Sequence, residues 1–501
     1  MIDMRKVIII IAALLMTLGA GAESKNFKLG KWVEIHNAIL KELGRSYVDT
    51  LPIDKMERAA IDAMLAELDP YTVFVPAEEQ EDFQLQIGKV YGGVGAIIYK
   101  PTPESNVVIN EPYAGSPAVK AGLHAGDELL EIDGETVHGL DSKACSDKMR
   151  GAPGTDVAFL VKKVWTGDTV SVVVTREKIH LPDVEYAGML DATTGYIAQS
   201  GFTEGVSDEI RQQVTALKKQ GMKRLVLDLR GNGGGLMQEA IRIVSIFVPR
   251  GSVVVTSKGR DPKDVEVYRT YEQPLDTKLP LIVLVDSGTA SSSEIVSGAL
   301  QDLDRATIMG RRTFGKGLIQ SLKPLPYGGQ LKVTVGKYYT PSGRCVQAID
   351  YSHRNPDGSV SQIPDSLTHE FKTKAGRIVR DGGGITPDVE LEAPKYDDIV
   401  YSLVMRGIVE QYALYYLRNH ETIAPAETFA LSEADYEGFV AYARELLPEK
   451  EKPLMDSLER LQIIPFIEEE IVVRYYYQAA GVQLRLRYDN ALKTALVSPT
   501  I

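Results

Sequence analysis

The sequence predicts an α/β protein of several domains, with a small α+β module, an α/β core and helical regions at both ends. At 501 residues the chain is too long for one ordinary domain, and its length favours about three. Short strand-like runs broken by glycine turns fill residues 91–174, whereas apolar runs alternate with amphipathic ones over residues 195–389. Helical periodicity dominates before and after these two segments.

The composition excludes several classes of function. A net charge of −12 argues against binding to nucleic-acid phosphates, because such binding requires a basic face. The seven histidines are scattered and no Cys/His cluster has the spacing of a zinc site, so no metal site is predicted. Cys145 and Cys345 lie far apart in the sequence, and we expect them to be unpaired thiols.

The N-terminus has the pattern of an export signal. Arg5 and Lys6 precede an apolar run from Val7 to Leu18, and Ala20-Gly21-Ala22 follows. A charged start, a short apolar segment and a small-residue cleavage site are typical of signal peptides. The run is shorter than the about 20 apolar residues of a membrane span, although an uncleaved anchor is the alternative. We therefore expect cleavage after Ala22 and a location in the periplasm or at the extracytoplasmic side of the membrane.

Residues from about Lys31 to Gln86 are predicted to form a small helical element. Apolar residues recur every four positions from Met56 to Leu68. Asp54, with a glutamate three residues later, is the predicted cap of this helix. Asp69-Pro70 is predicted to end it, because a residue that precedes proline disfavours the helical conformation.

A segment of strands and turns follows. Its predicted elements are a glycine turn entering a strand at Tyr91–Ile98, a short helix from Ser116 to Gly122, a strand with an Asp-Gly turn at Gly126–Gly134, a helix at Asp141–Met149 and a strand at Val157–Lys162. This order resembles that of a PDZ domain over the whole segment. PDZ domains bind a peptide as an added strand and hold its terminal carboxylate in a nest of backbone N–H groups. The residues Gly93, Val94, Gly95 and Ala96 would form that nest here.

The next segment predicts a sheet covered on its faces, because continuous apolar strands alternate with helices. The strand-like runs are Arg224–Leu229, Leu279–Val285, Ala306–Met309 and Leu331–Tyr339, and the helical runs are Val206–Lys219, Leu236–Phe247 and Glu294–Leu303. The C-terminal segment, from about Tyr396 to Ile501, is mostly helical and rich in Glu, Leu and Tyr. We expect it to be a packing or oligomerisation element.

The first candidate for chemistry is the run T-A-S-S-S-E-I between a buried strand and a helix. Ser291 is predicted to lie at the N-terminus of that helix, where unpaired N–H groups and the helix dipole favour negative charge. A nucleophilic serine there would have oxyanion stabilisation close by. Ser291 and Glu294 also have the spacing of a capping box, so a purely structural role is the alternative.

Two further runs lie in turns of the predicted core. Lys316, between two glycines in T-F-G-K-G, could serve as the base that a serine nucleophile needs if it is desolvated. The alternative is an ordinary solvated lysine. The run D-L-R-G-N-G-G-G from Asp228 to Gly235 ends the first core strand. Its glycines would let backbone N–H groups approach a ligand as oxyanion donors, or would simply form a tight turn.

Together these runs resemble the active site of the C-terminal processing peptidases, also called tail-specific proteases. By this resemblance Ser291 is the nucleophile and Lys316 the general base. Gln320 matches the glutamine that orients the lysine in this family. Gly234 and the backbone N–H of Ser292 correspond to the oxyanion donors.

The resemblance extends from the N-terminal helices to about Glu392 and includes the later runs Y-T-P-S-G-R and G-I-T-P-D. Gly233 is a small departure, because many members carry proline there. Arg150 resembles an arginine that links the position of the PDZ domain to activity in some members. The core would then be a peptidase domain of the crotonase/Clp-like α/β kind. The expected division is signal peptide 1–22, N-terminal helical region 23–90, PDZ-like domain 91–180, serine peptidase core 181–395 and C-terminal helical region 396–501.

The resemblance implies an exported serine endopeptidase that cleaves proteins near their C-termini without a cofactor. Its partners would be proteins or peptides with free apolar C-termini, and no nucleic acid. A homo-oligomer could form through the C-terminal helices.

Several rival functions were weighed against this one. The run G-R-R-T-F-G-K fits the start of a P-loop, but that loop needs Ser or Thr after the lysine and Gly317 is there instead. A Ser-His-Asp triad is not preferred, because no histidine lies within the core motifs. The alternative function is a PDZ-type binding or scaffold protein with a decayed or gated peptidase core. A decayed site would lack Ser291 or Lys316, and both are present. A structural role would leave their spacing unexplained.

Overall fold

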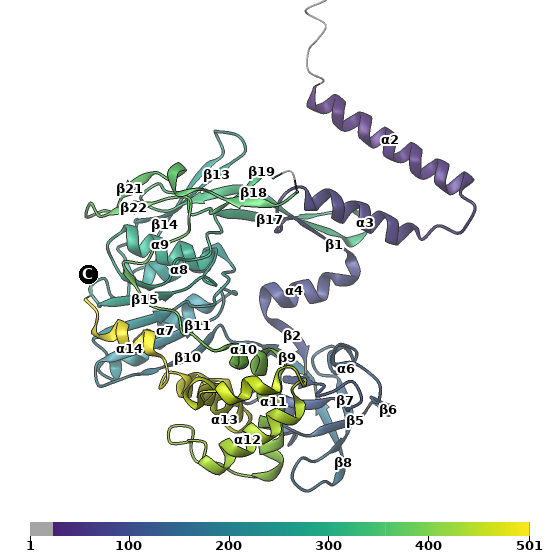
Figure 1. Cartoon of the computed structure of the whole chain (residues 1–501). Helices are drawn as coiled ribbons and strands as arrows, with labels where there is room; N and C mark the ends of the chain where they lie inside the picture. Colours follow the sequence, from purple (N-terminus) through teal and green to yellow (C-terminus); the bar gives the residue numbers. More distant parts are fainter. Residues whose placement is uncertain (1–23, 356, 500–501) are drawn as a thin grey trace, which may run out of the picture. The chain divides into compact units, whose positions relative to one another are not determined.

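The computed structural model describes residues 24–355 and 357–499 (Figure 1). The signal peptide predicted at residues 1–22 lies outside the described residues. The chain forms two compact units that divide between Glu67 and Leu68, and each is described by itself. No helix in the described part of the chain is both long enough and apolar enough to cross a membrane.

The N-terminal unit consists of two helices, α2 (Lys25–Ser46) and α3 (Ile53–Ala66). A hydrogen-bonded pair, His36 and Glu57, joins them at 3.2 Å. The predicted cap of α3 was wrong: Pro52 is the N-cap, and Asp54 lies within the first turn. A carboxylate in that turn still complements the positive end of the helix dipole. The acidic residue therefore lies near the helix N-terminus, as predicted, but inside the helix and not at its cap.

The large unit begins with a turn, strand β1 (Val73–Val75), a short 3-10 turn (Ala77–Glu79) and helix α4 (Gln80–Gly88). The prediction of helix throughout this stretch was therefore wrong at β1. This V-F-V run has strand-forming residues and pairs antiparallel with β18 (Gln330–Tyr339).

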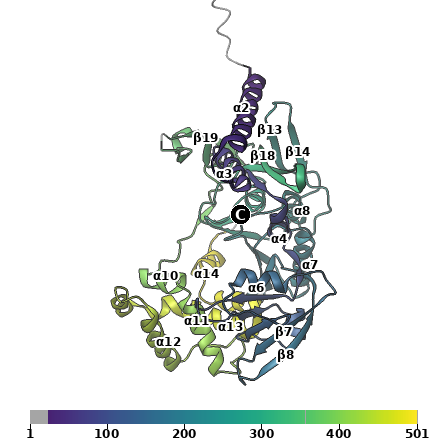
Figure 2. The ribbon, with the colours of Figure 1, turned by 90° about the vertical axis from the view of Figure 1, so that its right-hand side faces the viewer.

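A mixed module follows, whose sheet has the order β3-β4-β5-β7-β8. Its helix α6 and strands β7 and β8 can be followed in Figure 2. The sheet strands are β3 (Ala96–Tyr99), β4 (Val108–Pro112), β5 (Glu128–Ile132), β7 (Asp156–Lys162) and β8 (Thr169–Thr175), with β6 (Glu135–Thr136) beside β5 and helices α5 (Pro117–Lys120) and α6 (Ser142–Met149). Among the described strands β3 pairs with β4 alone, so it is an edge strand. Cys145 is buried in this module, and neither it nor Cys345 forms a disulfide.

A pair of short strands, β2 (Val90–Gly93) and β9 (Glu177–His180), joins this module to the α/β core. The core sheet has the order β10-β11-β12-β15-β16-β23 and is parallel apart from the β10/β11 pair. Its strands are β10 (Val184–Met189), β11 (Thr194–Gln199), β12 (Arg224–Asp228), β15 (Leu281–Val285), β16 (Thr307–Gly310) and β23 (Val389–Glu390).

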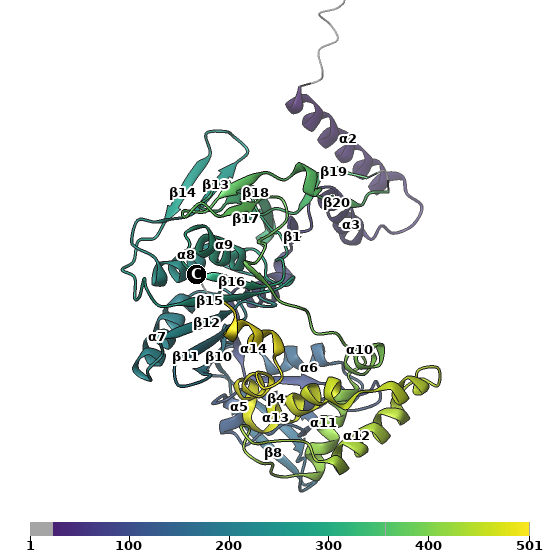
Figure 3. The ribbon, with the colours of Figure 1, turned by 60° about the vertical axis from the view of Figure 1, so that its left-hand side comes forward.

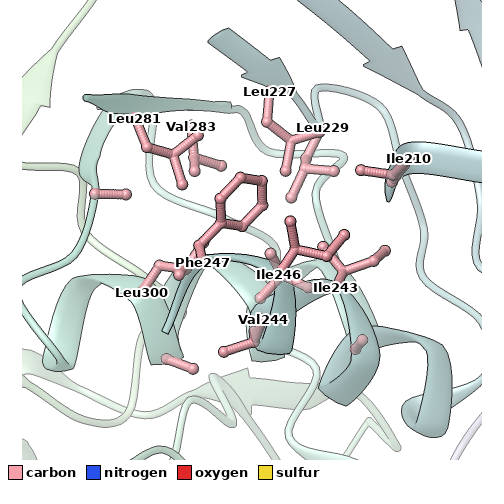
Figure 4. Packing of buried hydrophobic residues seen from close by; sticks show 14 of the residues in the cluster. Ile210, Leu227, Leu229, Ile243, Val244, Ile246, Phe247, Leu281, Val283 and Leu300 are labelled. Carbon is pink, nitrogen blue, oxygen red and sulfur yellow. The ribbon is translucent and has the colours of Figure 1, made fainter. Parts of the chain in front are cut away.

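Both faces of the core sheet are covered, as the continuous apolar strands predicted. Helices α7 (Val206–Lys219), α8 (Met237–Phe247) and α9 (Ser292–Asp302) contribute to the cluster on one face, where Phe247 lies among Leu227, Val283 and Leu300 (Figure 4). Alternate residues of the same strands, Val226 and Ile282, face the C-terminal helices instead. This alternation is the pattern of a strand buried on both sides.

A second, antiparallel sheet of order β1-β18-β13-β14 lies beside this core, and β17 pairs with β18. Its further strands are β13 (Val253–Gly259), β14 (Val265–Arg269) and β17 (Leu318–Pro324). The run at 331–339 is therefore a strand, as predicted, but it does not belong to the parallel sheet. A turn at Pro326–Gly328 folds it back on β17 as a hairpin. Smaller hairpins follow, β19 (Ile349–Arg354) with β20 (Val360–Gln362) and β21 (Glu370–Lys372) with β22 (Ile378–Arg380).

The C-terminal helices form a cluster of their own and also contact the core sheet and the mixed module (Figure 3). They are α10 (Asp398–Met405), α11 (Ile408–Asn419), α12 (Glu433–Leu446), α13 (Arg460–Arg485) and α14 (Asn490–Val497). Helix α13 has two parts that meet at Tyr477, whose φ of 66° is not helical. The first part packs in the helical cluster, and Val482 in the second part packs on the core sheet.

Candidate active site

Ser291 lies at the N-cap of α9, directly after the turn that follows β15. Its φ of 57° and ψ of −117° are rare for a residue with a side chain, and such strain is concentrated at functional sites. The surrounding structure holds this conformation in place. Thr289 Oγ1 donates to Leu229 O at 2.8 Å, and Ser293 Oγ donates to Asn232 O at 2.9 Å. The serine turn is thereby joined to the glycine turn after β12.

Gly234 comes so close to the serine turn that no other residue fits. A Cβ atom there would lie 2.8 Å from both Ser291 Cβ and Ser292 N, and the φ of +96° is itself in the left-handed region. The two predicted oxyanion donors, Gly234 and Ser292, are therefore neighbours of the serine. The Gly234 N–H, however, donates to Asn232 Oδ1 at 2.9 Å. An oxyanion would have to displace that side chain to use this donor.

Glu294 joins the serine turn to the lysine turn. Its buried carboxylate accepts the backbone N–H of Ser291 at 2.9 Å and that of Lys316 at 2.8 Å, both on Oε2. Oε1 accepts the Thr313 hydroxyl at 2.6 Å and the Gly315 N–H at 2.8 Å. Burial raises the pKa of this carboxyl, while these four donors oppose the rise. The capping glutamate thus also fixes the loop that carries the candidate base.

Lys316 lies on that loop with its side chain largely removed from solvent. The hydroxyl of Tyr338 donates to Lys316 O at 2.7 Å and to Ser291 O at 3.1 Å, which gives a second link between the two turns. Burial, followed by the charge of Lys332, lowers the pKa of Lys316 to about 8. Nζ lies 4.3 Å from the centre of the Tyr71 ring. Within the described residues no hydrogen bond joins it to Ser291 Oγ.

Gln320, on β17, is near this site but contacts a different group from the one expected. Its Nε2 donates to Thr334 Oγ1 at 3.2 Å. The described hydrogen bonds include none between Gln320 and the Lys316 amine. Thr334 Oγ1 in turn donates to Asp69 Oδ1 at 3.1 Å, so Gln320 is connected to the turn before β1.

The mixed module has a cavity of about 500 Å³ between β3 and α6. Val94 and Ala96 of the predicted carboxylate nest line it, together with Ile98, Tyr113 and Met149. Gly93 pairs with Glu177 in the β2–β9 ladder, and Gly95 has a φ of +75° where the chain turns into β3. The cavity therefore combines apolar side chains with an open strand edge, which is what an added peptide strand requires.

Arg150, at the end of α6, lines the same cavity. Its Nη1 lies 2.7 Å from Asp82 Oδ1 on α4, and its guanidinium is 5.8 Å from the centre of the Tyr91 ring. Arg150 thus connects the cavity to the helix that follows β1.

Three stretches of the sequence match known families. Residues 193–360 match "Peptidase family S41", residues 108–163 match "PDZ domain", and residues 399–452 match "Probable PDZ-protease, C-terminal helical domain". The chain is 35% identical over 330 residues to the "Carboxy-terminal-processing protease" of Bartonella bacilliformis, a match that covers 65% of this chain and 74% of that protein. The chain belongs to peptidase family S41.

A second relative agrees with this membership, and one solved structure is similar to the chain in sequence. The S41 chain is 31% identical over 364 residues to a "Probable CtpA-like serine protease" of Staphylococcus aureus, covering 72% of this chain and 65% of that protein. It is also 31% identical to the solved structure titled "Photosystem II D1 C-terminal processing protease", covering 70% of this chain and 86% of that one with a TM-score of 0.37.

The family membership confirms the prediction of a serine peptidase of the C-terminal processing kind with a PDZ domain. It also confirms a helical C-terminal region. A PDZ domain in a protease implies that peptide substrates bind to it. The crotonase/Clp-like likeness of the core is not confirmed by these matches and stays a prediction.

Two features of this S41 site were missed by sequence reasoning. The spacing from Ser291 to Glu294 indicated a cap, but nothing local shows that the lysine loop returns to the same carboxylate. The bond from Gly234 to Asn232 did have a local signal, because an asparagine side chain often accepts the backbone N–H two residues later, but the glycines alone were considered. In the part of the chain that the structure describes, no group of three or more His, Cys, Asp or Glu side chains could hold a metal ion.

Proposed function

We propose that this S41 peptidase is an exported endopeptidase that cleaves proteins near their C-termini, with Ser291 as nucleophile and Lys316 as general base. The observation that carries the proposal is the Glu294 carboxylate, which accepts backbone N–H groups from both residues. Two reacting groups on one fixed frame have the positioning that catalysis needs. The lowered pKa of Lys316, about 8, supports the role of base because part of the amine is neutral near pH 7.

The proposed reaction is acyl transfer. Neutral Lys316 takes the Ser291 proton, and the oxygen electron pair attacks the peptide carbonyl carbon. The carbonyl pair moves onto oxygen as an oxyanion, which the N–H groups of Ser292 and Gly234 would hold. Collapse expels the amine, which takes its proton from the Lys316 ammonium, and water then releases the acyl-enzyme by the same steps. Losing one oxyanion donor typically raises the barrier by about 2.7–4 kcal/mol.

The displacement of Asn232 would accompany this chemistry. Its Oδ1 accepts the Gly234 N–H, and its own Nδ2 donates to Gln199 O at 2.8 Å. A developing oxyanion is a stronger acceptor than an amide oxygen. We infer that the charged transition state competes for this donor better than the neutral substrate does. Gln320 would act on Lys316 indirectly, through Thr334 and Asp69.

The PDZ domain is proposed to select substrates with free apolar C-termini. The apolar cavity at Ile98 and Met149 would accept the last side chain, and the turn formed by Gly93, Val94, Gly95 and Ala96 would hold the carboxylate. Arg150 would link occupancy of this cavity to the peptidase through Asp82. Equal cleavage of amidated and free-acid peptides would contradict this part of the proposal, because amidation removes the terminal charge.

Export, the domain boundaries and oligomerisation are proposed on the sequence evidence. The periplasm or the extracytoplasmic side of the membrane follows from the signal peptide, whose test is N-terminal sequencing of the mature protein. A homo-oligomer through the C-terminal helices is supported by exposed apolar residues on α10, among them Tyr401 and Met405. Light scattering on the mature chain and on a Met405→Glu variant tests that contact.

The central test is cleavage of an unfolded protein with an apolar C-terminus by the purified mature chain. Ser291→Ala should abolish the cleavage. Lys316→Arg should be nearly as inactive, because arginine keeps the charge but cannot give up a proton. Circular dichroism must show that both variants are folded. A folded Lys316→Arg enzyme that cleaves at nearly the wild-type rate would contradict the serine–lysine mechanism.

The alternative with a specific observation behind it is a gated core. The Gly234 N–H is bound by Asn232, and the described hydrogen bonds do not join Lys316 to Ser291. A protein held in this arrangement would bind C-terminal peptides and cleave nothing until activated. Peptide binding without turnover, at every substrate tried, would favour this alternative.

A further inference from the structure

Tyr71 lies in a turn whose hydrogen bonds fix its backbone. Asp69 Oδ1 accepts the backbone N–H groups of Tyr71 and Thr72, each at 3.0 Å. The Thr72 hydroxyl donates to the other oxygen of the same carboxylate at 3.1 Å. One aspartate thus accepts from three donors and fixes the backbone of the turn that carries Tyr71.

The turn is also fastened to the strand beside the active site. Thr334 of β18 donates through Oγ1 to Asp69 Oδ1 at 3.1 Å and through its backbone N–H to Thr72 Oγ1 at 3.2 Å. Gln320 Nε2 donates to that same Thr334 hydroxyl at 3.2 Å. The pairing of β1 with β18 continues the attachment. The turn that carries Tyr71 is therefore attached to β18, the strand that also pairs with β17 and so with Gln320.

The Lys316 amine lies 4.3 Å from the centre of this ring, on its face. An aromatic face attracts an ammonium through its quadrupole and has no such attraction for a neutral amine. We propose that Tyr71 is a positioning residue for Lys316, whose ring holds the protonated lysine and lets the neutral amine move to Ser291. The inference rests on the proposed serine–lysine mechanism. It gives the turn before β1 a role in the reaction.

The charges around Lys316 show how the ring would act. Glu294 faces the lysine from α9, Asp69 from the turn and Lys332 from β18. Burial and Lys332 lower the pKa of Lys316, while both carboxylates raise it. The ring acts in the same direction as the carboxylates, because it favours the charged form. Tyr71 itself stays neutral, because burial raises the pKa of its hydroxyl.

The test is the pH dependence of kcat/KM, whose acid limb reports the base of the free enzyme. Tyr71→Leu keeps an apolar side chain but removes the aromatic face, and the limb should move to lower pH by about 0.4–1.5 units. Tyr71→Phe keeps the face and should keep the wild-type limb. Tyr71→Ala opens the site to water and should move the limb to higher pH. Tyr186→Leu removes a half-buried tyrosine that packs against the C-terminal helices and should leave the limb unchanged.

A second series avoids changes of volume. Phenylalanines carrying one to three fluorine atoms, introduced at position 71, weaken the ring quadrupole at nearly constant shape. The acid limb should move stepwise to lower pH along the series. A limb that stays fixed along the series, or in folded Tyr71→Leu, overturns the role of Tyr71. Failure of the underlying mechanism looks different, because Lys316→Arg would then remain active whatever stands at position 71.

Discussion

Glu294 supports both candidate turns through hydrogen bonds to their backbone N–H groups. Its two carboxylate oxygens accept four donors, from Ser291, Thr313, Gly315 and Lys316. A carboxylate can accept on both oxygens, whereas an amide can accept on only one. The carboxylate therefore holds the serine and lysine turns together in addition to capping α9.

Glu294→Gln is expected to lower kcat/KM by about 100-fold, because its NH₂ group would face two donors and push one of the two turns out of place. Unpaired buried donors should also reduce the free energy of unfolding by about 1–3 kcal/mol. Peptide cleavage and urea unfolding measure the two effects. The exposed Glu204→Gln is the control, and wild-type activity in folded Glu294→Gln would contradict the prediction.

Gly234→Ala is expected to abolish cleavage. The new Cβ would lie 2.8 Å from Ser291 Cβ and from Ser292 N, at a φ of +96° that alanine resists. Peptide binding to the PDZ domain should persist, because that cavity is lined by other residues. Fluorescence titration with a labelled peptide checks binding. The control is Gly231→Ala, because a Cβ there would meet nothing within 4 Å although φ is also positive. A loss of activity seen only in Gly234→Ala is therefore due to the steric contact and not to the positive φ.

At the scale of elements, strand β4 of the PDZ domain and helix α13 form a polar contact. Asn110 lies between Glu410 and Arg474, at 3.0 Å and 2.8 Å. The neighbouring Glu111 is buried and accepts a hydrogen bond from Gln478, next to the bend of α13. Its second oxygen has no partner among the described residues, and burial raises its pKa to about 7.

The raised pKa of Glu111 predicts a pH-dependent stability. Between the ordinary pKa of 4.5 and about 7, the folded chain keeps a proton that the unfolded chain loses, so stability falls as the pH rises. Glu111→Gln has no proton to lose. The free energy of unfolding of the variant, relative to that of the wild type, should therefore rise by about 3 kcal/mol between pH 4.5 and pH 7. Urea unfolding at several pH values measures this, with the exposed Glu104→Gln as control; a difference independent of pH would contradict it.

The sequence predicted most elements of the core and indicated the candidate residues of the site, but it did not indicate the contacts among those residues. Apolar periodicity placed α7 at its observed bounds, since both its ends and its inner face are local properties. The bond between Glu294 and the lysine loop depends on how β16 returns to β15, which no local pattern encodes. No local pattern indicates a role for Tyr71 either, because its partner Lys316 is distant in the sequence and the sequence predicts helix where β1 lies.

At the scale of the whole large unit, the C-terminal helices touch both the PDZ domain and the peptidase core. Trp165 Nε1 donates to Leu417 O at 2.9 Å on the PDZ side. On the core side, Arg230 Nη2 lies 2.5 Å from Asp489, the N-cap residue of α14, and also binds Asp228. Arg230 directly precedes the glycine turn of the candidate site. A region that the sequence predicted to be a packing or oligomerisation element thus contacts the residue before the glycine turn of the candidate site.

Asp489→Ala is expected to lower kcat while leaving KM and PDZ peptide binding unchanged, because Arg230 loses the partner that holds it from the helical side. The free energy of unfolding should fall by about 1–3 kcal/mol, as is usual when a half-buried charge loses a partner. Asp456→Ala, which removes an exposed carboxylate of the same helical region, is the control. Equal kcat values in the two variants would contradict this coupling.

On the proposed mechanism, the backbone conformation of Ser291 decides which inactive variant suits the capture of a substrate complex. Ser291→Ala retains a Cβ and therefore the strained φ of 57°, so the turn must stay as the wild-type contacts hold it. Ser291→Gly removes the steric conflict and should unfold at a higher temperature than Ser291→Ala, despite the greater freedom of glycine in the unfolded chain. The glycine variant would also let the N-cap relax and blur the position of the scissile carbonyl. Folding and chemistry favour different residues at this position, and the alanine enzyme is the one that would trap a peptide in the geometry of attack.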